Sequence, residues 1–144
     1  IDCENYTEEI FNYFFLLDEA YNLKIDNLFD FAKRVMSDFD YKGYKLGIIY
    51  GIDGDYQSII ADKILFDKKL DYEVVAFLNV HGTVSFRSKN NIDVSDIAKK
   101  LGMIVGYSGG GHKHASGCRI CDRDEMKKKM MEIFEHSMNK IKIL

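Results

Sequence analysis

The chain has 144 residues, of which 47% are hydrophobic, and carries a formal net charge of −3 at pH 7. This length and apolar content suffice for one domain with its own core, which excludes a chain that is disordered over most of its length. The negative charge argues against a protein that coats nucleic acid without specificity, and apolar runs far shorter than roughly 20 residues argue against membrane insertion.

The first 40 residues are acidic and rich in aromatic side chains. They contain ten Asp and Glu against three Lys and Arg. Apolar residues recur every three or four positions in residues 5–21 and again in residues 26–39, which predicts two amphipathic helices that could pack as a helical hairpin. We assign residues 1–40 to an acidic helical connector and expect it to come from a longer chain.

A strand, a turn and a helix follow. Residues 45–51 form a short apolar run bounded by glycines, which predicts a buried strand, and helical periodicity extends from residue 56 to about residue 70. Asp53 and Asp55 lie between these two elements. Paired aspartates after a strand can hold a divalent metal, but aspartate is also a preferred N-cap residue. Because no histidine or further carboxylate stands close by in the sequence, we favour the capping role.

Two strand-like runs, residues 72–80 and 83–88, are separated by His81 and Gly82. A two-residue spacer of this kind is typical of a tight β-hairpin. The period of two in the second run places its apolar residues on one face of the strand and Arg87 on the other. An arginine there is commonly a solvated sheet residue, but its planar guanidinium also suits phosphate or a base edge if that face lines a cleft.

The next predicted element is a short helix that begins with Asp93 or Ser95 as its cap and is ended by Gly102. Residues 103–108 then separate the end of this helix from a run of glycines. We therefore expect an extended connection before that run.

The last elements are a closing strand and a helix. Residues 118–121 predict the strand, and Asp122 with Glu125 forms a plausible capping pair for an amphipathic C-terminal helix. Together the elements predict an α/β fold. We expect a small mixed β-sheet of about four to five strands, packed with helices and preceded by the helical N-terminal extension.

The most unusual stretch has three consecutive glycines, a histidine and then several small residues. Glycine has no Cβ and adopts positive φ readily, so consecutive glycines let a backbone approach a ligand and turn its N–H groups toward it. The stretch lies within residues 84–123, which carry seven Lys and Arg against three Asp although the whole chain is acidic. We therefore predict an anion-binding loop, whose residues are Gly109, Gly110, Gly111, His112, Ala115, Ser116 and Gly117.

Three stretches, in this order, resemble the C-terminal DHH-associated domain of DHH-family phosphoesterases. Within that family the chain is most similar to the enzymes that degrade very short RNA and dephosphorylate 3′-phosphoadenosine 5′-phosphate, with RecJ-type exonucleases as relatives. The resemblance covers residues 41–144, which we assign to a DHH-associated substrate-binding domain. The stretches are Val84-Ser85-Phe86-Arg87-Ser88, Ile92-Asp93-Val94-Ser95-Asp96-Ile97-Ala98 and Gly109-Gly110-Gly111-His112-Lys113-His114-Ala115-Ser116-Gly117.

The resemblance implies a division of labour. In the family, an N-terminal domain supplies aspartates and histidines for two divalent metals, usually manganese, and the C-terminal domain closes over the substrate and binds its nucleotide end. The implied partners are short RNA or DNA, or a nucleotide such as 3′-phosphoadenosine 5′-phosphate, together with that catalytic domain. The residues that match the family's substrate site by position are Arg87, Gly109, Gly110, Gly111, His112, Ser116 and Gly117.

The metal-binding half of such an enzyme has no counterpart in this sequence. No stretch reads Asp-His-His, and the chain has four histidines in all. We therefore expect no catalytic residue, metal ligand or cofactor within these residues, and manganese on the separate catalytic domain. The resemblance also makes residues 103–108 an insertion, because the family usually runs the end of the helix almost directly into the glycines.

Three alternatives stay open at this point. Thiolate and imidazole groups of His112, His114, Cys118 and Cys121 could hold zinc, although two cysteines three apart on a strand point to opposite faces. The chain could be a self-sufficient metallophosphoesterase that uses Asp53, Asp55 and the histidines. It could also be a structural or oligomerising module, for example a homodimer that forms through its acidic N-terminal helices.

The cysteine content and the N-terminal residues indicate the cellular compartment. Three cysteines are an odd number, and their spacing is not that of a disulfide framework. No charged-then-apolar segment typical of a secretion signal opens the sequence. We therefore expect a reducing, cytoplasmic setting.

Overall fold

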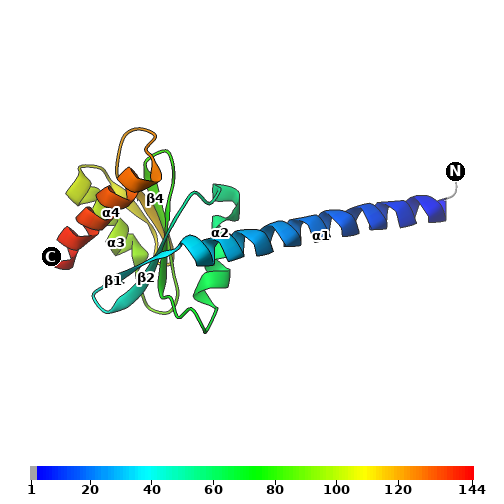
Figure 1. Ribbon diagram of the computed structural model, residues 1–144, viewed down its shortest axis with the longest axis horizontal. Helices are drawn as coiled ribbons and strands as arrows, with labels where there is room; N and C mark the ends of the chain where they lie inside the picture. Colours follow the sequence, from blue (N-terminus) through cyan, green and yellow to red (C-terminus); the bar gives the residue numbers. More distant parts are fainter. Residues whose placement is uncertain (1–2) are drawn as a thin grey trace.

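The protein is built around a six-stranded mixed sheet in the order β1-β2-β3-β4-β6-β5 (Figure 1). The structure is a computed structural model that describes the backbone of residues 3–144 and the side chains of residues 7–144. Only β2 and β3 are parallel; the other neighbouring strands are antiparallel. The predicted mixed α/β fold is confirmed, with six strands in place of four to five. The strands are β1 (Ser37–Tyr41), β2 (Tyr44–Tyr50), β3 (Val74–Leu78), β4 (Thr83–Ser88), β5 (Gly109–His112) and β6 (Ala115–Arg119), and the helices are α1 (Cys3–Val35), α2 (Gly54–Leu65), α3 (Val94–Val105) and α4 (Lys127–Lys142).

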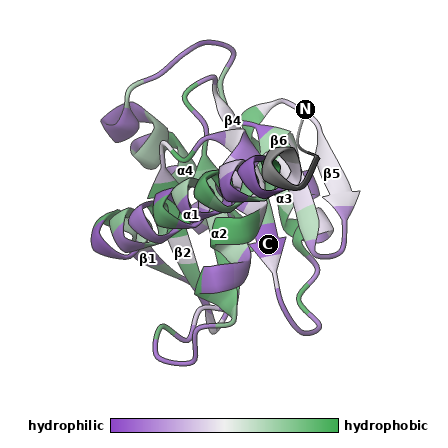
Figure 2. Ribbon diagram, turned by 90° about the vertical axis from the view of Figure 1, so that its right-hand side faces the viewer, coloured by the Kyte–Doolittle hydropathy of each residue, from purple (hydrophilic) through white to green (hydrophobic). Residues whose placement is uncertain are grey.

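The sheet has a core on each face. On one face, Val84 and Phe86 of β4 pack with α3 and α4, and the rings of Phe86 and Phe134 lie 6.1 Å apart. On the other face, Val75 and Phe77 of β3 pack with α2 and the end of α1. We call these the α3 face and the α2 face. The core on the α2 face includes no residue of β4, β5 or β6, so this apolar core leaves that half of the face uncovered; in Figure 2, β5 lies beside α1 and α2.

The N-terminal segment is one helix, not the predicted pair. Helix α1 is continuous from Cys3 to Val35, because residues 21–26 contain neither glycine nor proline to interrupt it. Residues 37–41 form strand β1 where the second helix was predicted to continue. Lys42 and Gly43, with φ of 51° and 87°, make the tight turn to β2, which is the geometry of a two-residue hairpin.

Helix α3 does not end at Gly102, as the sequence suggested. It continues to Val105 and is terminated by Gly106 in the left-handed conformation, with φ of 84°. A Cβ atom on Gly102 would lie 2.8 Å from the backbone nitrogen of Gly109, so glycine at that position lets β5 approach the helix closely. The expected insertion at residues 103–108 is therefore mostly helix, and only residues 106–108 connect α3 to the glycines.

The predicted helix caps are partly confirmed. Asp53 caps α2 by accepting a hydrogen bond of 2.9 Å from the backbone N–H of Asp55, and Asp93, not Ser95, caps α3. The predicted pair for the last helix is wrong, because α4 begins after Met126 without a side-chain cap. Three further elements differ in their bounds: α2 ends at Leu65 rather than near residue 70, β3 spans residues 74–78 rather than 72–80, and the closing strand β6 spans residues 115–119 rather than 118–121. No helix in the described part of the chain is long and apolar enough to span a bilayer.

Candidate functional site

The uncovered half of the α2 face brings Arg87 and His112 into one row of the sheet. Ala115 of β6 pairs with Arg87 of β4 on one side and with His112 of β5 on the other. Partners across a ladder point to the same face, and neighbouring strands lie about 4.8 Å apart. The two side chains therefore rise from the same face, from backbones roughly 10 Å apart.

Both side chains of this row are available to a ligand. Arg87 is half-buried, and its guanidinium makes no hydrogen bond or ion pair to any other described residue. His112 is exposed, and its imidazole likewise has no hydrogen-bonding partner within residues 7–144. A guanidinium offers five N–H donors in a planar fork that matches phosphate and carboxylate oxygens. The pair can therefore bind an anion without first breaking a contact within the protein.

The next row along the sheet has almost no side chains, and we call it the floor. It consists of Ser85, Gly117 and Gly110, which are paired in that order across β4, β6 and β5. A Cβ on Gly117 would lie 2.7 Å from the carbonyl oxygen of Val84, so this position has no room for a side chain. A Cβ on Gly110 would meet nothing closer than Cε of Lys99, at 3.8 Å. The floor is thus flat and open beside Arg87 and His112. We call the residues of these two rows on β4, β6 and β5 the open face.

The glycine run is an edge strand, not the predicted loop. β5 pairs with β6 along its whole length and lies at the edge of the sheet. A Cβ on Gly109 would lie 2.1 Å from the carbonyl oxygen of Ala98 in α3, and Gly111 has φ of 140°. Glycine is therefore required at position 109 by the close approach of the helix and at position 111 by the backbone conformation.

Three of the predicted site residues do not share the open face. The register places Gly109, Gly111 and Ser116 on the α3 face, since Ser116 is paired with Phe86 of the α3-face core. The Ser116 hydroxyl donates to the carbonyl oxygen of His112 at 3.1 Å. Of the seven predicted residues, the structure brings together Arg87, Gly110, His112 and Gly117.

A chain of hydrogen bonds that the sequence did not reveal leads to the open face from α2. The buried amide of Gln57 donates to Oδ1 of Asn79 at 2.6 Å and to the carbonyl oxygen of Ile52 at 2.9 Å. Asn79 in turn donates to the hydroxyls of Thr83 at 3.0 Å and Ser85 at 3.3 Å. Because the Ser85 hydroxyl accepts from Asn79, its own hydrogen is free to point to an acceptor on the open face. No local pattern links these residues, which come from α2, the β3–β4 turn and β4.

A small pocket lies where the parallel strands β2 and β3 end. Its volume is about 370 Å³. Ligands of open α/β sheets commonly bind in the crevice outside the carboxyl ends of parallel strands. Arg119 is fixed nearby, because its Nη1 donates to the carbonyl oxygens of His81 at 2.8 Å and Cys121 at 2.9 Å. The residues that line the pocket are Gly51, Ile52, Asp53, Gly54, Asn79, Val80 and His81.

The four residues of the zinc alternative have separate surroundings. Cys118 is buried on the α3 face, where burial raises the pKa of its thiol to about 12 and keeps it neutral. The sulfur of Cys121 lies 3.6 Å from that of Met130, and Nδ1 of His114 lies 3.1 Å from the Ser88 hydroxyl. Across the described residues, no three His, Cys, Asp or Glu side chains are placed to hold one metal ion. The arrangement therefore does not support zinc binding here.

Comparison with protein families gives one match. The family model described as "DHHA1 domain" matches residues 43–140. This range contains the whole open face and every strand except β1. No curated protein matches the chain.

Solved structures share the fold at low sequence identity. An uncharacterized protein from Helicobacter pylori G27 aligns with a TM-score of 0.67 and 24% identity over 82% of this chain. An exopolyphosphatase-related protein from Bacteroides fragilis aligns with a TM-score of 0.55 and 19% identity over 82% of the chain, and RecJ from Thermus thermophilus, in complex with Mg²⁺, with 0.56 and 17% over 87%. The aligned region is 33%, 35% and 19% of those three proteins, so this chain spans about a third or less of their length.

Proposed function

This chain belongs to the DHHA1 domain family, and on that premise we propose that its open face binds the phosphate groups of a short oligonucleotide or of a nucleotide such as 3′-phosphoadenosine 5′-phosphate. A separate DHH domain would then supply the divalent metals, manganese in our proposal, and hydrolyse the phosphoester. The setting that we propose is the cytoplasm.

The observation that supports this proposal most directly is the row formed by Arg87 and His112. An arginine without a protein partner among the described residues stands beside an exposed histidine, above a floor that has almost no side chains. Hydrogen bonds to charged groups are worth about 1.5–3 kcal/mol each, roughly twice those between neutral groups. The flat floor lets a phosphodiester lie against the backbone, and contacts to phosphate carry no base preference.

One further group on the same side of the sheet can contact a phosphate. The Ser85 hydroxyl can donate to a second phosphate oxygen next to Arg87. The fold neighbours include an exopolyphosphatase-related protein and a RecJ bound to Mg²⁺, which agrees with a phosphate-containing substrate and a divalent metal.

We assign hydrolysis of the phosphoester to the separate DHH domain because Asp53, the candidate metal ligand of this chain, already accepts a hydrogen bond as a helix cap. The Asp53 side chain accepts a hydrogen bond from the first turn of α2, which is the arrangement of a helix cap. We therefore infer that the chain contributes substrate binding and not the hydrolytic step.

The proposal is tested by calorimetric titration of residues 1–144 with 3′-phosphoadenosine 5′-phosphate and with a 5′-phosphorylated diribonucleotide at low salt. We expect Arg87→Ala and His112→Ala each to weaken binding at least tenfold without a change in the melting temperature. Arg34→Ala and His136→Ala remove the same side-chain types from exposed positions on α1 and α4 and serve as matched controls. If the parent chain binds neither ligand, or if all four variants bind like the parent, the proposal is wrong.

A further inference from the structure

A third row of the sheet extends the open face beyond the floor. Arg119 of β6 is paired with Thr83 of β4, and each lies two residues from the floor row, which contains Ser85 and Gly117. Because side chains alternate along a strand, Thr83 and Arg119 rise from the same side of the sheet as Arg87. The three rows therefore place one arginine at each end of a stretch that has only small side chains between them.

The guanidinium of Arg119 is held in place from one side only. Its Nη1 donates to the carbonyl oxygens of His81 and Cys121, which uses both hydrogens of that nitrogen. Nε and Nη2 make no hydrogen bond or ion pair to any residue that the structure describes. The edge formed by these two nitrogens can bind two oxygens of one phosphate. Because the guanidinium is already fixed, phosphate binding at this edge costs little further side-chain freedom.

A hydroxyl stands beside this free edge. The Thr83 hydroxyl accepts a hydrogen bond of 3.0 Å from the side-chain amide of Asn79, so its own hydrogen is free to point to another acceptor. Ladder partners have Cβ atoms about 5 Å apart, which puts this hydroxyl within reach of an anion on Arg119. The pocket of about 370 Å³ adjoins the same place, since Asn79 and His81 line it. A phosphate thus finds donors here, and the sugar or base attached to it finds space.

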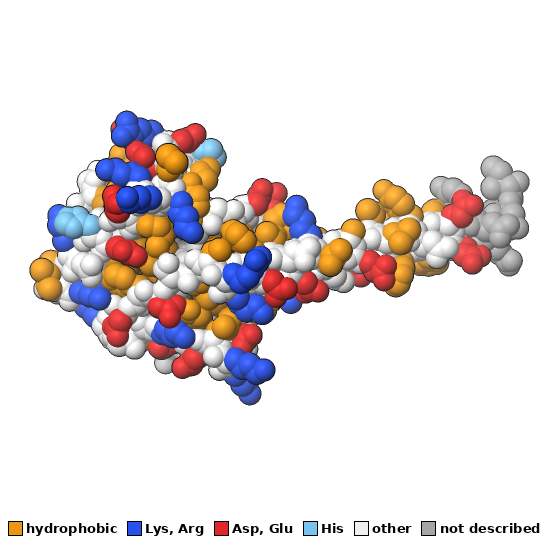
Figure 3. Space-filling view, viewed as in Figure 1, with side chains coloured by type: hydrophobic (Ala, Val, Ile, Leu, Met, Phe, Trp, Pro, Cys, Tyr) orange, Lys and Arg blue, Asp and Glu red, His pale blue; other side chains and the backbone are white. Residues whose placement is uncertain are grey.

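The end of the sheet around Arg119 is not a general basic patch. Figure 3 shows Lys and Arg side chains mixed with Asp, Glu and His at the top of the molecule, where Figure 1 draws the loop between β6 and α4. In this loop, Nε of Arg123 lies 2.8 Å from a carboxylate oxygen of Glu125. The feature that distinguishes Arg119 is therefore its free guanidinium edge and not the net charge of its surroundings.

The floor between the two arginines has a cation at its edge. Lys99 of α3 comes close to it, because Cε of Lys99 lies 3.8 Å from the position of a Cβ on Gly110. Lys99 is exposed, and its ammonium makes no hydrogen bond or ion pair to another described residue. The neighbouring Lys100, in contrast, is paired with Asp96 at 2.9 Å. The middle row can therefore also receive a phosphate, between Lys99 and the hydroxyl of Ser85.

The spacing of the rows matches the spacing of phosphates in an extended backbone. Arg87 and Thr83 are four residues apart on β4, about 14 Å, with the floor row halfway between them. Neighbouring phosphorus atoms of a nucleic acid are joined by the same number of covalent bonds as Cα atoms two residues apart. One extended nucleotide step therefore also spans about 7 Å. Two such steps, which connect three consecutive phosphates, cover the distance from the first row to the third.

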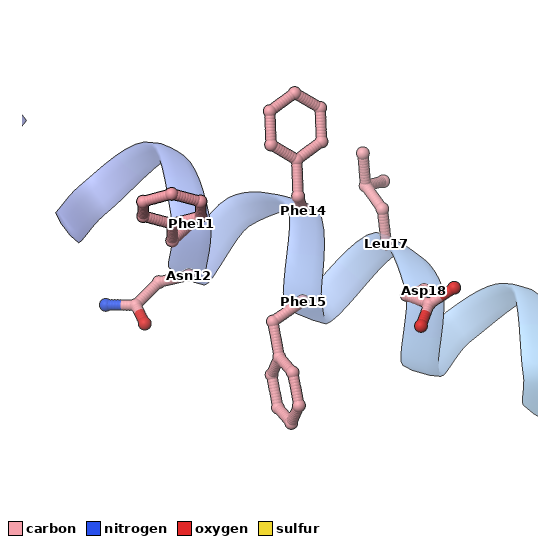
Figure 4. A pocket seen from close by; sticks show the side chains of 6 residues that line it. All are labelled: Phe11, Asn12, Phe14, Phe15, Leu17 and Asp18. Carbon is pink, nitrogen blue, oxygen red and sulfur yellow. The ribbon is translucent and has the colours of Figure 1, made fainter. Parts of the chain in front are cut away.

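Helix α1 leaves the three rows accessible. It packs on α2 through Ile25 and Ala32, and its first half projects away from the sheet (Figure 1). The projecting half carries exposed aromatic side chains, of which Phe14 and Phe15 point to opposite sides of the helix (Figure 4). These side chains lie well away from the sheet, so they do not occupy the space above β4 and β6.

We propose that Arg119 and Thr83 form a second phosphate site and that the open face holds three consecutive phosphates of a single-stranded oligonucleotide. The first phosphate lies on Arg87 and His112, the second lies over the floor beside Lys99, and the third lies on Arg119. This inference rests on the proposed function. It selects an oligonucleotide of three or more residues, rather than a mononucleotide, as the ligand that uses the whole face.

Calorimetric titration of residues 1–144 with 5′-phosphorylated oligoadenylates of increasing length tests the proposal. Because a hydrogen bond to a charged group is worth more than a neutral one, we expect about tenfold tighter binding of the trinucleotide than of the dinucleotide. A fourth nucleotide should add less than about twofold, because the row of Arg119 is the last. Arg119→Gln should abolish the gain at the trinucleotide and leave the dinucleotide affinity within about twofold of the parent. Arg123→Gln, the same change at a neighbouring arginine that has a carboxylate partner, is the matched control and should keep the gain.

Two further measurements separate phosphate binding from the structural contacts of Arg119. Thr83→Val keeps the carbonyl contacts of Arg119 and should weaken trinucleotide binding about fivefold, with no change for the dinucleotide. Tripolyphosphate also carries three phosphates, but single oxygen atoms join them, so it is too short to reach from Arg87 to Arg119. Its affinity should therefore be the same for the parent and Arg119→Gln.

The outcomes distinguish this inference from the proposed function. Equal affinity of the parent for the dinucleotide and the trinucleotide overturns the second phosphate site, and so does a parental gain in both Arg119→Gln and Thr83→Val. Either result leaves the site at Arg87 and His112 intact as long as Arg87→Ala weakens binding of the dinucleotide. Parental dinucleotide affinity in Arg87→Ala and His112→Ala would instead contradict the proposed function itself.

Discussion

Arg87 and His112 face the same side of the sheet because Ala115 is the ladder partner of both. The 24 residues between them in the sequence include α3 and its two connections, which return the chain to the sheet two strands away. The small side chain of Ala115 leaves the space between the arginine and the histidine open. This one row brings together the residues of the proposed anion-binding site, each of which is ordinary when taken alone.

The salt dependence of binding should report the Arg87 contact. Each phosphate that a protein cation neutralises steepens the fall of log K with log salt by about 0.7 for single strands. Arg87→Ala should therefore reduce the slope by about that amount for a short single-stranded oligonucleotide. Fluorescence anisotropy at salt concentrations between about 50 and 200 mM measures the slope. Arg34→Ala should keep the parental slope, and an unchanged slope in Arg87→Ala would show that its guanidinium does not contact phosphate.

Two neighbouring glycines should respond in opposite ways to the same substitution. The site of a Cβ at Gly110 is open, so Gly110→Ala should fold with the parental melting temperature but weaken nucleotide binding, because a methyl group then stands on the floor of the open face. Gly109→Ala forces its Cβ against the backbone of α3 and should destabilise the domain by about 1–3 kcal/mol. Thermal denaturation and titration of both variants make the comparison. Equal melting temperatures for the two variants would contradict the described contact of β5 with α3.

The hydrogen-bond chain from Gln57 should matter for binding through Ser85. Ser85→Ala removes a hydroxyl from a partly exposed position, so we expect stability within about 0.5 kcal/mol of the parent and roughly fivefold weaker binding. Asn79→Ala should weaken binding similarly and also cost about 1–3 kcal/mol of stability, because the buried Gln57 amide loses its acceptor. Urea denaturation and calorimetry measure the two effects. If both variants bind with the affinity of the parent, Ser85 does not contact the nucleotide.

The buried thiol of Cys118 should make stability depend on alkaline pH. Burial raises its pKa to about 12 in the folded protein, against about 8.5 for an unfolded cysteine. Its contribution to stability is therefore complete below about pH 8.5 and is lost as pH rises toward 12, at about 1.4 kcal/mol per pH unit. Comparison with Cys118→Ala by urea denaturation at pH 8 and pH 10 isolates this group. The parent should lose about 2 kcal/mol more than the variant, and an equal loss in both would show that the thiol ionises freely in the folded state.

Local patterns determined much of the sheet. The alternation of residue types along β4 predicts that Arg87 points away from the apolar residues, and the burial of Val84, Phe86 and Ser88 confirms it. The hairpin between β3 and β4 and the cap at Asp53 were also predicted correctly, although four residues rather than two separate the strands, and Asp93 was one of two candidates for the cap of α3. These features depend on neighbours within a few residues, so the sequence contains their full physical cause.

The tertiary structure decided what the glycines do. Consecutive glycines fit a loop and an edge strand equally well, and only the pairing of β5 with β6 selects the strand. That pairing then fixes the faces: a side chain period of two sends Gly110, Gly117 and His112 to the open face and Ser116 to the other. For the same reason the sequence does not show that only the second half of α1 packs on α2. Apolar periodicity indicates that a helix needs a partner but not where that partner lies. Strand register and helix burial depend on contacts between distant parts of the chain, and these contacts are set by packing rather than by local sequence.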